Sequence, residues 1–382
     1  MNSYAYLDHN ATTTLRPEAR EAMMAALALT ANPSSVHGPG RDARKMLEAA
    51  RSQVAALVGA ARSDVIFTSG GTEANNLAIQ GCGRQRVLVS AIEHPSVLNC
   101  GGEIIPVDGD GIVDLESLDM MLSADDRPAL VSVMLANNET GVIEPIAQVV
   151  EIAHRHGALV HCDAVQAAGK ITIDIGDLGV DMLTLSGHKI GGPSGVGALI
   201  VDGLDTRQDM NLRATGFGGG HERGFRAGTE NLAGIAGFGA AASCAPEMIA
   251  DVARIRGMRD RLEAAVRAIE PDVEIFAEGT ARLGNTSCLT MPGSESSTQL
   301  MSFDLAEIGV SAGSACSSGK VKTSGVLKAM GVDTDRAGTA VRVSLGWPNE
   351  DRDVDSFISA WAELYDRVNE SYGNSKLSKP AA

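Results

Sequence analysis

The sequence LSGHKIGGP, residues 185–193, places a single lysine, Lys189, between a predicted strand and a glycine-rich turn. The glycines after it allow the backbone to approach a ligand closely. A lysine amine at such a strand end can form a Schiff base with an aldehyde cofactor. The usual alternative for a single lysine is a solvated surface charge, but a motif upstream argues against it.

That motif is HCDAVQ, residues 161–166, which ends another predicted strand. Asp163 and Gln166 are three residues apart, so a starting helical turn puts both side chains on one side. The carboxylate can keep a cofactor ring nitrogen protonated, and the amide can donate to a phenolic oxygen of the ring. Asp163 can equally be a helix N-cap. Together with Lys189, the pair predicts pyridoxal phosphate as the cofactor.

A phosphate site is predicted at FTSGGTEA, residues 67–74, which has the pattern of a strand, a glycine turn and a helix start. Backbone N–H groups at a helix N-terminus bind phosphate, and Thr72 adds a hydroxyl group. Ser186 and His188, next to Lys189, can contact the same phosphate. The alternative is an ordinary turn with a threonine cap.

Three further polar residues follow or occupy predicted strands. His94 can stack on the cofactor ring and transfer a proton near neutral pH, or it is an ordinary loop histidine. Asn138 can orient cofactor or substrate, or it serves only a turn. Arg342 lies in an alternating apolar strand and requires a carboxylate, which is either a substrate's or an internal partner's.

Cys316 is the predicted reactive thiol. It lies in SAGSACSSG, residues 311–319, and this run of small residues predicts an exposed loop in which Lys320 and Lys322 can stabilise a thiolate. The other cysteines lie in helical or strand patterns, where a buried thiol is the default. Of these, Cys162 is the one alternative to Cys316.

The fold class predicted is α/β, because strands alternate with helical segments between Ser63 and Asp202, as in a mainly parallel sheet. Seven strands are predicted at 65–68, 86–90, 103–107, 129–135, 158–162, 181–186 and 195–201, with helices at 73–80, 115–122 and 146–156. After Pro246 the pattern changes to helices at 248–269 and 351–369 and strands at 286–291 and 340–345. We therefore predict a large domain over 15–245, and a smaller α+β domain formed by 1–14 and 246–382.

Composition argues against several classes of partner, location and site. The net charge of −16 and the absence of a long basic run argue against nucleic acid as the main partner. The N-terminus lacks the pattern of a signal peptide, and the most apolar segment, 232–245, is shorter than the roughly 20 residues of a membrane span. Six scattered cysteines without a CxxC pair predict neither a metal site nor disulfides, and favour the reducing cytoplasm.

Taken together, the chain resembles the NifS/IscS-type cysteine desulfurases, which are class V aminotransferases of fold type I and depend on pyridoxal 5'-phosphate. The motifs that carry this resemblance are YLDHNATT (6–13), NPSSVH (32–37), Gly71-Thr72, Glu93-His94, NNE (137–139), Asp163 with Gln166, SGHK (186–189) and GGGHERG (218–224). The SAC loop is similar to the branch of the family that has a long catalytic loop.

The resemblance implies a role for each matching residue. Lys189 would hold the cofactor, His94 would stack on its ring as acid and base, and Cys316 would accept the substrate's sulfur as a persulfide. Arg342 would bind the carboxylate of L-cysteine, with Asn138 nearby. The cofactor would be bound by Gly71, Thr72, Asp163, Gln166, Ser186 and His188, and by Thr229 (in RAGT, 226–229) of the partner subunit in a homodimer.

The resemblance leaves the sulfur acceptor open. The C-terminal extension that IscS-type members use to dock an iron–sulfur scaffold is not recognisable after Tyr372. Two other functions stay possible on the same fold: an aminotransferase or selenocysteine or cysteine-sulfinate lyase in which Cys316 is incidental, and a catalytically silent sulfur carrier.

Overall fold

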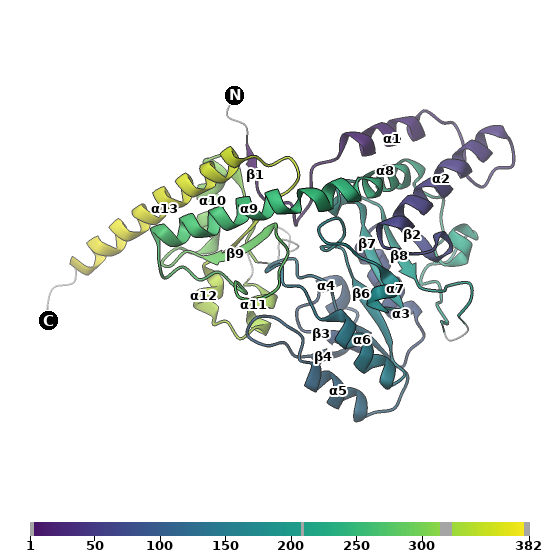
Figure 1. Ribbon diagram of the computed structural model, residues 1–382, viewed down its shortest axis with the longest axis horizontal. Helices are drawn as coiled ribbons and strands as arrows, with labels where there is room; N and C mark the ends of the chain where they lie inside the picture. Colours follow the sequence, from purple (N-terminus) through teal and green to yellow (C-terminus); the bar gives the residue numbers. More distant parts are fainter. Residues whose placement is uncertain (1–3, 208–209, 314–322, 378–382) are drawn as a thin grey trace.

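Seven strands form the central sheet of the chain (Figure 1), in a computed structural model that describes residues 4–207, 210–313 and 323–377. The strands are β2 (Val65–Thr68), β3 (Arg86–Ser90), β4 (Glu103–Ile105), β5 (Ala129–Ser132), β6 (Leu159–Asp163), β7 (Met182–Ser186) and β8 (Gly197–Val201). Their order is β2-β8-β7-β6-β5-β3-β4, and only β8 runs antiparallel to its neighbours. The carboxyl ends of the parallel strands therefore meet at one edge, where ligands gather in such sheets.

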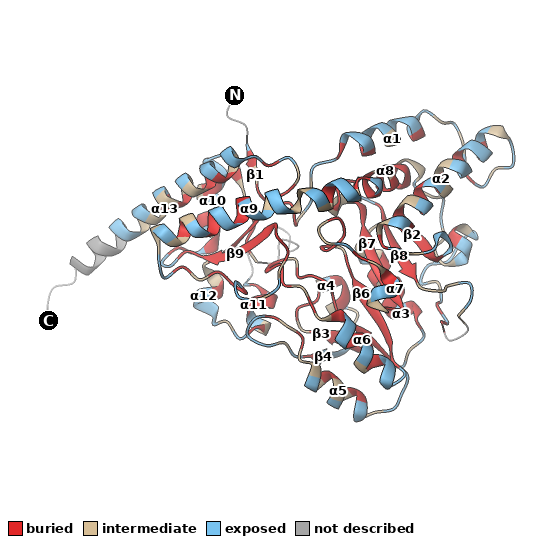
Figure 2. Ribbon diagram, in the orientation of Figure 1, coloured by how far each residue is buried: buried red, intermediate tan, exposed pale blue. Residues whose placement is uncertain are grey.

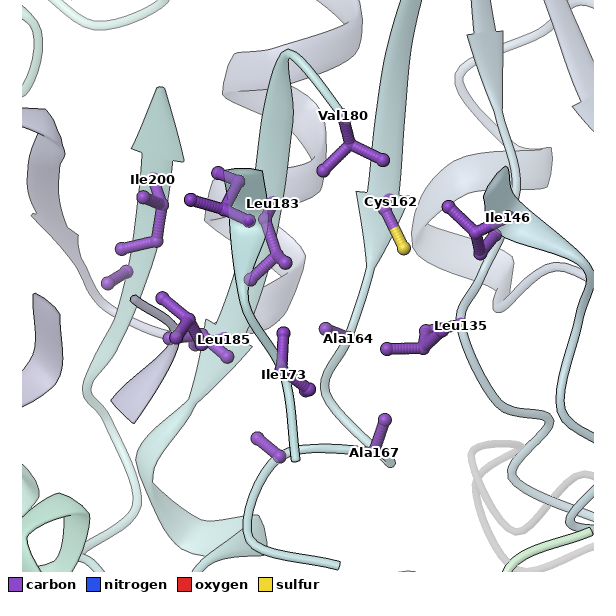
Figure 3. Close-up of a cluster of buried hydrophobic side chains, with 14 of the residues drawn as sticks. Leu135, Ile146, Cys162, Ala164, Ala167, Ile173, Val180, Leu183, Leu185 and Ile200 are labelled. Atoms are coloured by element: carbon purple, nitrogen blue, oxygen red, sulfur yellow. The ribbon is translucent and has the colours of Figure 1, made fainter. Parts of the chain in front are cut away.

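Helices cover both faces of this sheet, because its strands carry apolar side chains on both sides. One face packs against α2 (Gly38–Leu57), α5 (Leu115–Ser123), α6 (Ile146–Arg155) and α8 (Leu232–Ser243), and α1 (Pro17–Leu27) lies against α8. The other face packs against α3 (Gly71–Gly81) and α4 (Pro95–Leu98). Figure 3 shows part of the first layer, with Cys162 of β6 and Leu183 and Leu185 of β7. This two-sided burial holds the strand ends rigidly in place.

A second apolar cluster joins the two ends of the chain. Its elements are β1 (Ala5–Tyr6), α9 (Ala245–Ile269), β9 (Thr286–Thr290), α10 (Ser296–Leu305), β10 (Ile308–Gly309), β11 (Ala340–Ser344) and α13 (Asp351–Leu377). Strand β1 pairs with β10 in parallel, and β9 pairs with β11 antiparallel. Figure 1 shows α9 running beside α13, and Figure 2 shows their exposed outer faces over a buried layer. The limits of the two predicted domains stay a prediction.

The shorter elements connect this framework. They are η1 (Arg62–Asp64), α7 (Ile175–Leu178), η2 (Gly187–Lys189), η3 (His221–Gly224), α11 (Gly325–Ala329) and α12 (Thr334–Gly338). Among the described residues, no single helix is long and apolar enough to cross a membrane. Helices α8 and α9 meet that test by length and composition only as a pair, bent by 59°.

The predicted strands and helices correspond closely to the observed ones. Strands β2 and β3 have the predicted limits, whereas β5 ends at Ser132, three residues before the predicted end. The last helix continues to Leu377 rather than ending at Asn369. Helices α1 and α2, β1 and β10 lie outside the elements that the sequence predicts.

A buried carboxyl group, Glu144, makes stability depend on pH. Its Oε2 accepts from the backbone N–H of Val113 at 2.9 Å, and its Oε1 has no hydrogen-bond partner among the described residues. Burial, with a smaller effect of Asp108, raises the pKa from 4.5 to about 8. The folded chain thus keeps a proton that the unfolded chain loses, so stability falls as the pH rises through this window.

We expect Glu144→Gln to remove this dependence. Its free energy of unfolding should match that of the parent chain near about pH 4.5 and exceed it by a few kcal/mol near about pH 9, on the scale of roughly 1.4 kcal/mol per pKa unit. Urea unfolding at a series of pH values measures the difference. An equal difference at every pH would show that Glu144 does not titrate as its burial indicates.

Candidate active site

Lys189 ends the short segment η2, which follows β7 directly. Its amine donates to the backbone oxygens of Asn10 and Ala11, the second at 2.7 Å. The side chain is half-buried, at the sheet edge where parallel strands end. This is not the environment of a solvated surface lysine.

Asp163 is the last residue of β6, and its side chain is buried. Its Oδ1 accepts from the backbone N–H of Val165 at 2.9 Å, and its Oδ2 accepts from Asn75 Nδ2 at 2.7 Å. A turn rather than a helix follows β6, so the alternative of Asp163 as a helix N-cap is wrong. Gln166 donates its Nε2 to the backbone oxygen of Asn10 at 2.9 Å, the same atom that Lys189 contacts.

A chain of hydrogen bonds joins His94 to Asp163. His94 Nδ1 lies 2.7 Å from Ser96 Oγ, which accepts from Asn75 Nδ2 at 2.9 Å. His94 Nδ1 also accepts from the backbone N–H of Ser96, so the neutral ring carries its proton on Nε2. Asn75 is a site residue that the sequence interpretation misses. Its only signal is an amide on an otherwise apolar, buried face of α3.

Of the residues predicted to bind phosphate, Gly71 and Thr72 begin α3, and Ser186 lies beside Gly71. A Cβ at Gly71 would lie 3.0 Å from Val165 Cγ2 and 3.6 Å from Ser186 Cβ, so the glycine lets α3 approach the end of β7. Thr72, next in the chain, is exposed. His188 contacts Thr12 Oγ1 at 3.2 Å, and burial, with a smaller effect of Lys189, lowers its pKa to about 4. The ring is thus neutral at pH 7.

Arg342 lies in β11, and its guanidinium is buried. Nη2 pairs with Asp8 Oδ1 at 2.6 Å, and Nη1 donates to the backbone oxygen of Asn138 at 3.0 Å. The internal ion pair that the sequence left open is therefore present. Asn138 O also accepts from Asn10 Nδ2 at 3.1 Å, which places the predicted substrate residues next to the N-terminal segment that holds Lys189.

Lys170 is a second residue that the sequence interpretation misses. Its amine donates to the backbone oxygen of Gln166 at 2.9 Å, to Gln166 Oε1 at 3.1 Å and to Asn10 Oδ1 at 3.5 Å. Burial of the amine lowers its pKa to about 7, and the charges of Lys189 and Arg342 add to this effect. Both Nε2 and Oε1 of the Gln166 amide therefore have hydrogen-bond partners. No pattern in the sequence distinguishes Lys170 from a surface lysine.

Two predicted residues are not placed at the site by this chain alone. Thr229 is exposed, and Arg226 Nε contacts Glu73 Oε1 at 3.1 Å, so the segment before Thr229 lies beside the first turn of α3. The role of the partner's threonine stays a prediction. Cys316, with Lys320 and Lys322, lies outside the described residues.

The five described cysteines are free, and four of them are buried, as predicted. Cys100 is partly exposed instead, and it lies two residues after the end of α4. Cys162, the alternative to Cys316, is wholly buried, and this burial raises the pKa of its thiol well above the usual value. A thiolate is therefore strongly disfavoured at Cys162.

These residues fit pyridoxal phosphate. Asp163 is a buried carboxylate that receives only neutral N–H donors, and within the described residues no cation pairs with it. A protonated ring nitrogen supplies the cation that such a carboxylate lacks. Lys189 lies at the neighbouring strand end. The N-terminus of α3, with the exposed Thr72, lies beside the end of β7, where its N–H groups can bind a phosphate.

An α/β chain with a lysine, a buried carboxylate and a helix N-terminus at one sheet edge belongs structurally with the transferases of fold type I. The family model described as "Aminotransferase class-V" matches residues 5–357. A cysteine desulfurase of Cereibacter sphaeroides is 42% identical over 95% of this chain and 96% of its own length. The chain therefore belongs to the class-V aminotransferases, which depend on pyridoxal phosphate, and among them to the cysteine desulfurases.

Solved structures agree with this assignment. A NifS-like protein from Rickettsia africae is 38% identical, covers 94% of this chain and 99% of its own, and has a TM-score of 0.87. SspA in complex with cysteine is 30% identical, covers 89% of this chain and 98% of its own, and has a TM-score of 0.75. These comparisons confirm the predicted family, fold class and enzyme class.

Proposed function

We propose that this chain converts L-cysteine to L-alanine and transfers the sulfur to Cys316 as a persulfide, with pyridoxal 5'-phosphate as its cofactor. The observation that carries the proposal is the buried Asp163 carboxylate, which pairs with no cation among the described residues and lies at the strand end next to Lys189. When bound, the cofactor supplies the electron sink that makes the α-proton of an amino acid acidic. The cysteine found in the related SspA complex is consistent with this substrate.

The residues of the chain have distinct tasks in this proposal. Asp163 and Gln166 hold the ring, Gly71, Thr72, Ser186 and His188 hold the phosphate, and His94 stacks on the ring. Lys189 would bind the cofactor covalently, and its amine would be the base that removes the α-proton of the substrate. Arg342 and Asn138 orient the substrate carboxylate.

Sulfur transfer then needs only the thiolate of Cys316. It attacks the sulfur of the substrate, so an S–S bond forms while the bond between Cβ and sulfur breaks. The electron pair of that bond stays with carbon, which takes a proton and becomes the methyl group of alanine. Because Nδ1 of His94 accepts from the backbone N–H of Ser96, the neutral ring carries its proton on Nε2 and can donate that proton to the β-carbon.

We further propose that the enzyme acts as a homodimer in the cytoplasm and delivers its sulfur to an acceptor protein such as an iron–sulfur scaffold. Thr229 is exposed at the surface of the single chain, where a second copy can receive it. The five described cysteines are unpaired, which suits a reducing compartment.

Mass spectrometry after brief exposure to L-cysteine tests the proposed function. We expect the peptide that contains Cys316 to gain one sulfur atom, with one alanine formed for each sulfur in the first turnover. Alanine without sulfur on that peptide would contradict the role of Cys316. The absence of alanine would instead favour an aminotransferase or another lyase on the same fold.

A further inference from the structure

The pair between Asp8 and Arg342 occupies the group that the proposed function assigns to the substrate carboxylate. Asp8 Oδ1 lies 2.6 Å from Nη2 of Arg342. The two side chains differ in exposure, since Arg342 is 3% exposed and Asp8 is 17% exposed. The guanidinium is thus fixed in the protein interior, whereas the carboxylate lies closer to solvent.

The guanidinium is only partly used by this pair. Nε and Nη2 form one edge of the planar group, and a carboxylate that binds such an edge accepts from both nitrogens. Asp8 accepts from Nη2, whereas Nε is buried and has no hydrogen-bond partner among the described residues. Nη1, outside this edge, is engaged by the backbone oxygen of Asn138. A substrate carboxylate that accepts from both Nε and Nη2 would therefore take the position that the Asp8 carboxylate occupies.

The backbone of Asp8 is held independently of its side chain. Its carbonyl oxygen accepts from the hydroxyl of Tyr6 at 3.0 Å and from the backbone N–H of Ala11 at 3.0 Å. It also forms a β-bridge with Ser344, two residues after Arg342. The side chain can consequently rotate away from Arg342 without moving the backbone of Asp8.

We propose that Asp8 is a specificity-determining residue that stands in for the substrate carboxylate: it neutralises Arg342 in the resting enzyme and is displaced from Nη2 when L-cysteine binds. This inference rests on the proposed function of Arg342. An incoming anion must compete with Asp8, so a monodentate or poorly placed anion is rejected, and only a carboxylate that reaches both Nε and Nη2 displaces it.

Calorimetric binding of 3-mercaptopropionate to the intact holoenzyme tests this inference. The compound carries the thiol and carboxylate of cysteine but lacks the amine, so its binding needs no turnover. We expect Asp8→Asn to tighten its binding about tenfold or more, because a neutral amide does not compete for the guanidinium as a carboxylate does. Weaker or unchanged binding would overturn the inference and make Asp8 a residue that merely positions Arg342.

Two controls separate carboxylate recognition from general effects. 3-Mercaptopropan-1-ol, which has an alcohol in place of the carboxylate, should bind Asp8→Asn and the parent enzyme equally. Arg342→Gln should abolish the gain when combined with Asp8→Asn, since the two residues act on one ligand group. A gain that persists without Arg342 would overturn the inference.

A crystal structure of the parent enzyme with 3-mercaptopropionate keeps the inference testable if Asp8→Asn does not fold. Asp8 should then lie away from Nη2, with the ligand carboxylate on Nε and Nη2. A retained contact between Asp8 and Arg342 would overturn it. Failure of the proposed function is distinguishable, because loss of persulfide formation on Cys316 does not alter carboxylate binding at Arg342.

Discussion

Lys189→Ala is expected to abolish both covalent attachment of the cofactor and turnover of L-cysteine. In the proposed function the lysine amine binds the aldehyde and removes the α-proton, and proton transfer alone contributes about 10² to 10⁴ in rate. We therefore expect alanine formation to fall at least a thousandfold, on the order of that range. Borohydride reduction followed by mass spectrometry should find the cofactor on the peptide of Lys189 in the parent chain and on no peptide of the variant.

Lys170→Ala is the matched control for this experiment. Lys170 contacts the same N-terminal residue, Asn10, but its amine is directed to the oxygens of Gln166. The variant should keep covalent cofactor at Lys189. Attachment of the cofactor to Lys170 in the parent chain would contradict the assignment.

Cys316→Ala is expected to lose nearly all desulfuration while it keeps the cofactor. Without the thiolate, no group is left to attack the substrate's sulfur, so we expect alanine formation to fall about a hundredfold or more. Absorbance of the bound cofactor and alanine release, measured on the same sample, separate cofactor binding from sulfur transfer. Unimpaired turnover with L-cysteine would favour an aminotransferase or lyase in which this thiol is incidental.

Cys100→Ala and Cys162→Ala provide the controls for that loss. Cys162 is wholly buried in the core and Cys100 is partly exposed beside α4, so neither is expected to replace Cys316. Both variants should retain the persulfide on the Cys316 peptide. A persulfide that moves to Cys100 would identify a different acceptor.

The elements that surround the site were predictable because their sequence pattern is local. Strands such as β2 and β7 are short apolar runs buried on both faces, and glycines and polar residues end them. The positions of Lys189 and Asp163 at strand ends follow from that pattern. Strand β1 escapes prediction because it is only two residues long and pairs with β10, roughly three hundred positions later in the chain.

The contacts between site residues depend on packing rather than pattern. Asn75 is identified only by its hydrogen bonds to Ser96 and Asp163, and Lys170 only by those to Gln166 and Asn10. A local sequence does not distinguish a buried amide or amine from an exposed one, because burial is decided by segments distant in the chain. For the same reason, the sequence left open whether Arg342 pairs with a substrate carboxylate or with one of the chain's own.

The amino-acid sequence by itself determined the sheet, the family and the residue types that chemistry requires, because these depend on periodicity and on ordered short motifs. Only the tertiary structure decided that Asn10, Lys170 and Gln166 surround Lys189, and that Asp8 pairs with Arg342. The physical reason is that the N-terminal segment crosses to β11 and to the end of β7, so residues far apart in sequence share one buried, charged neighbourhood.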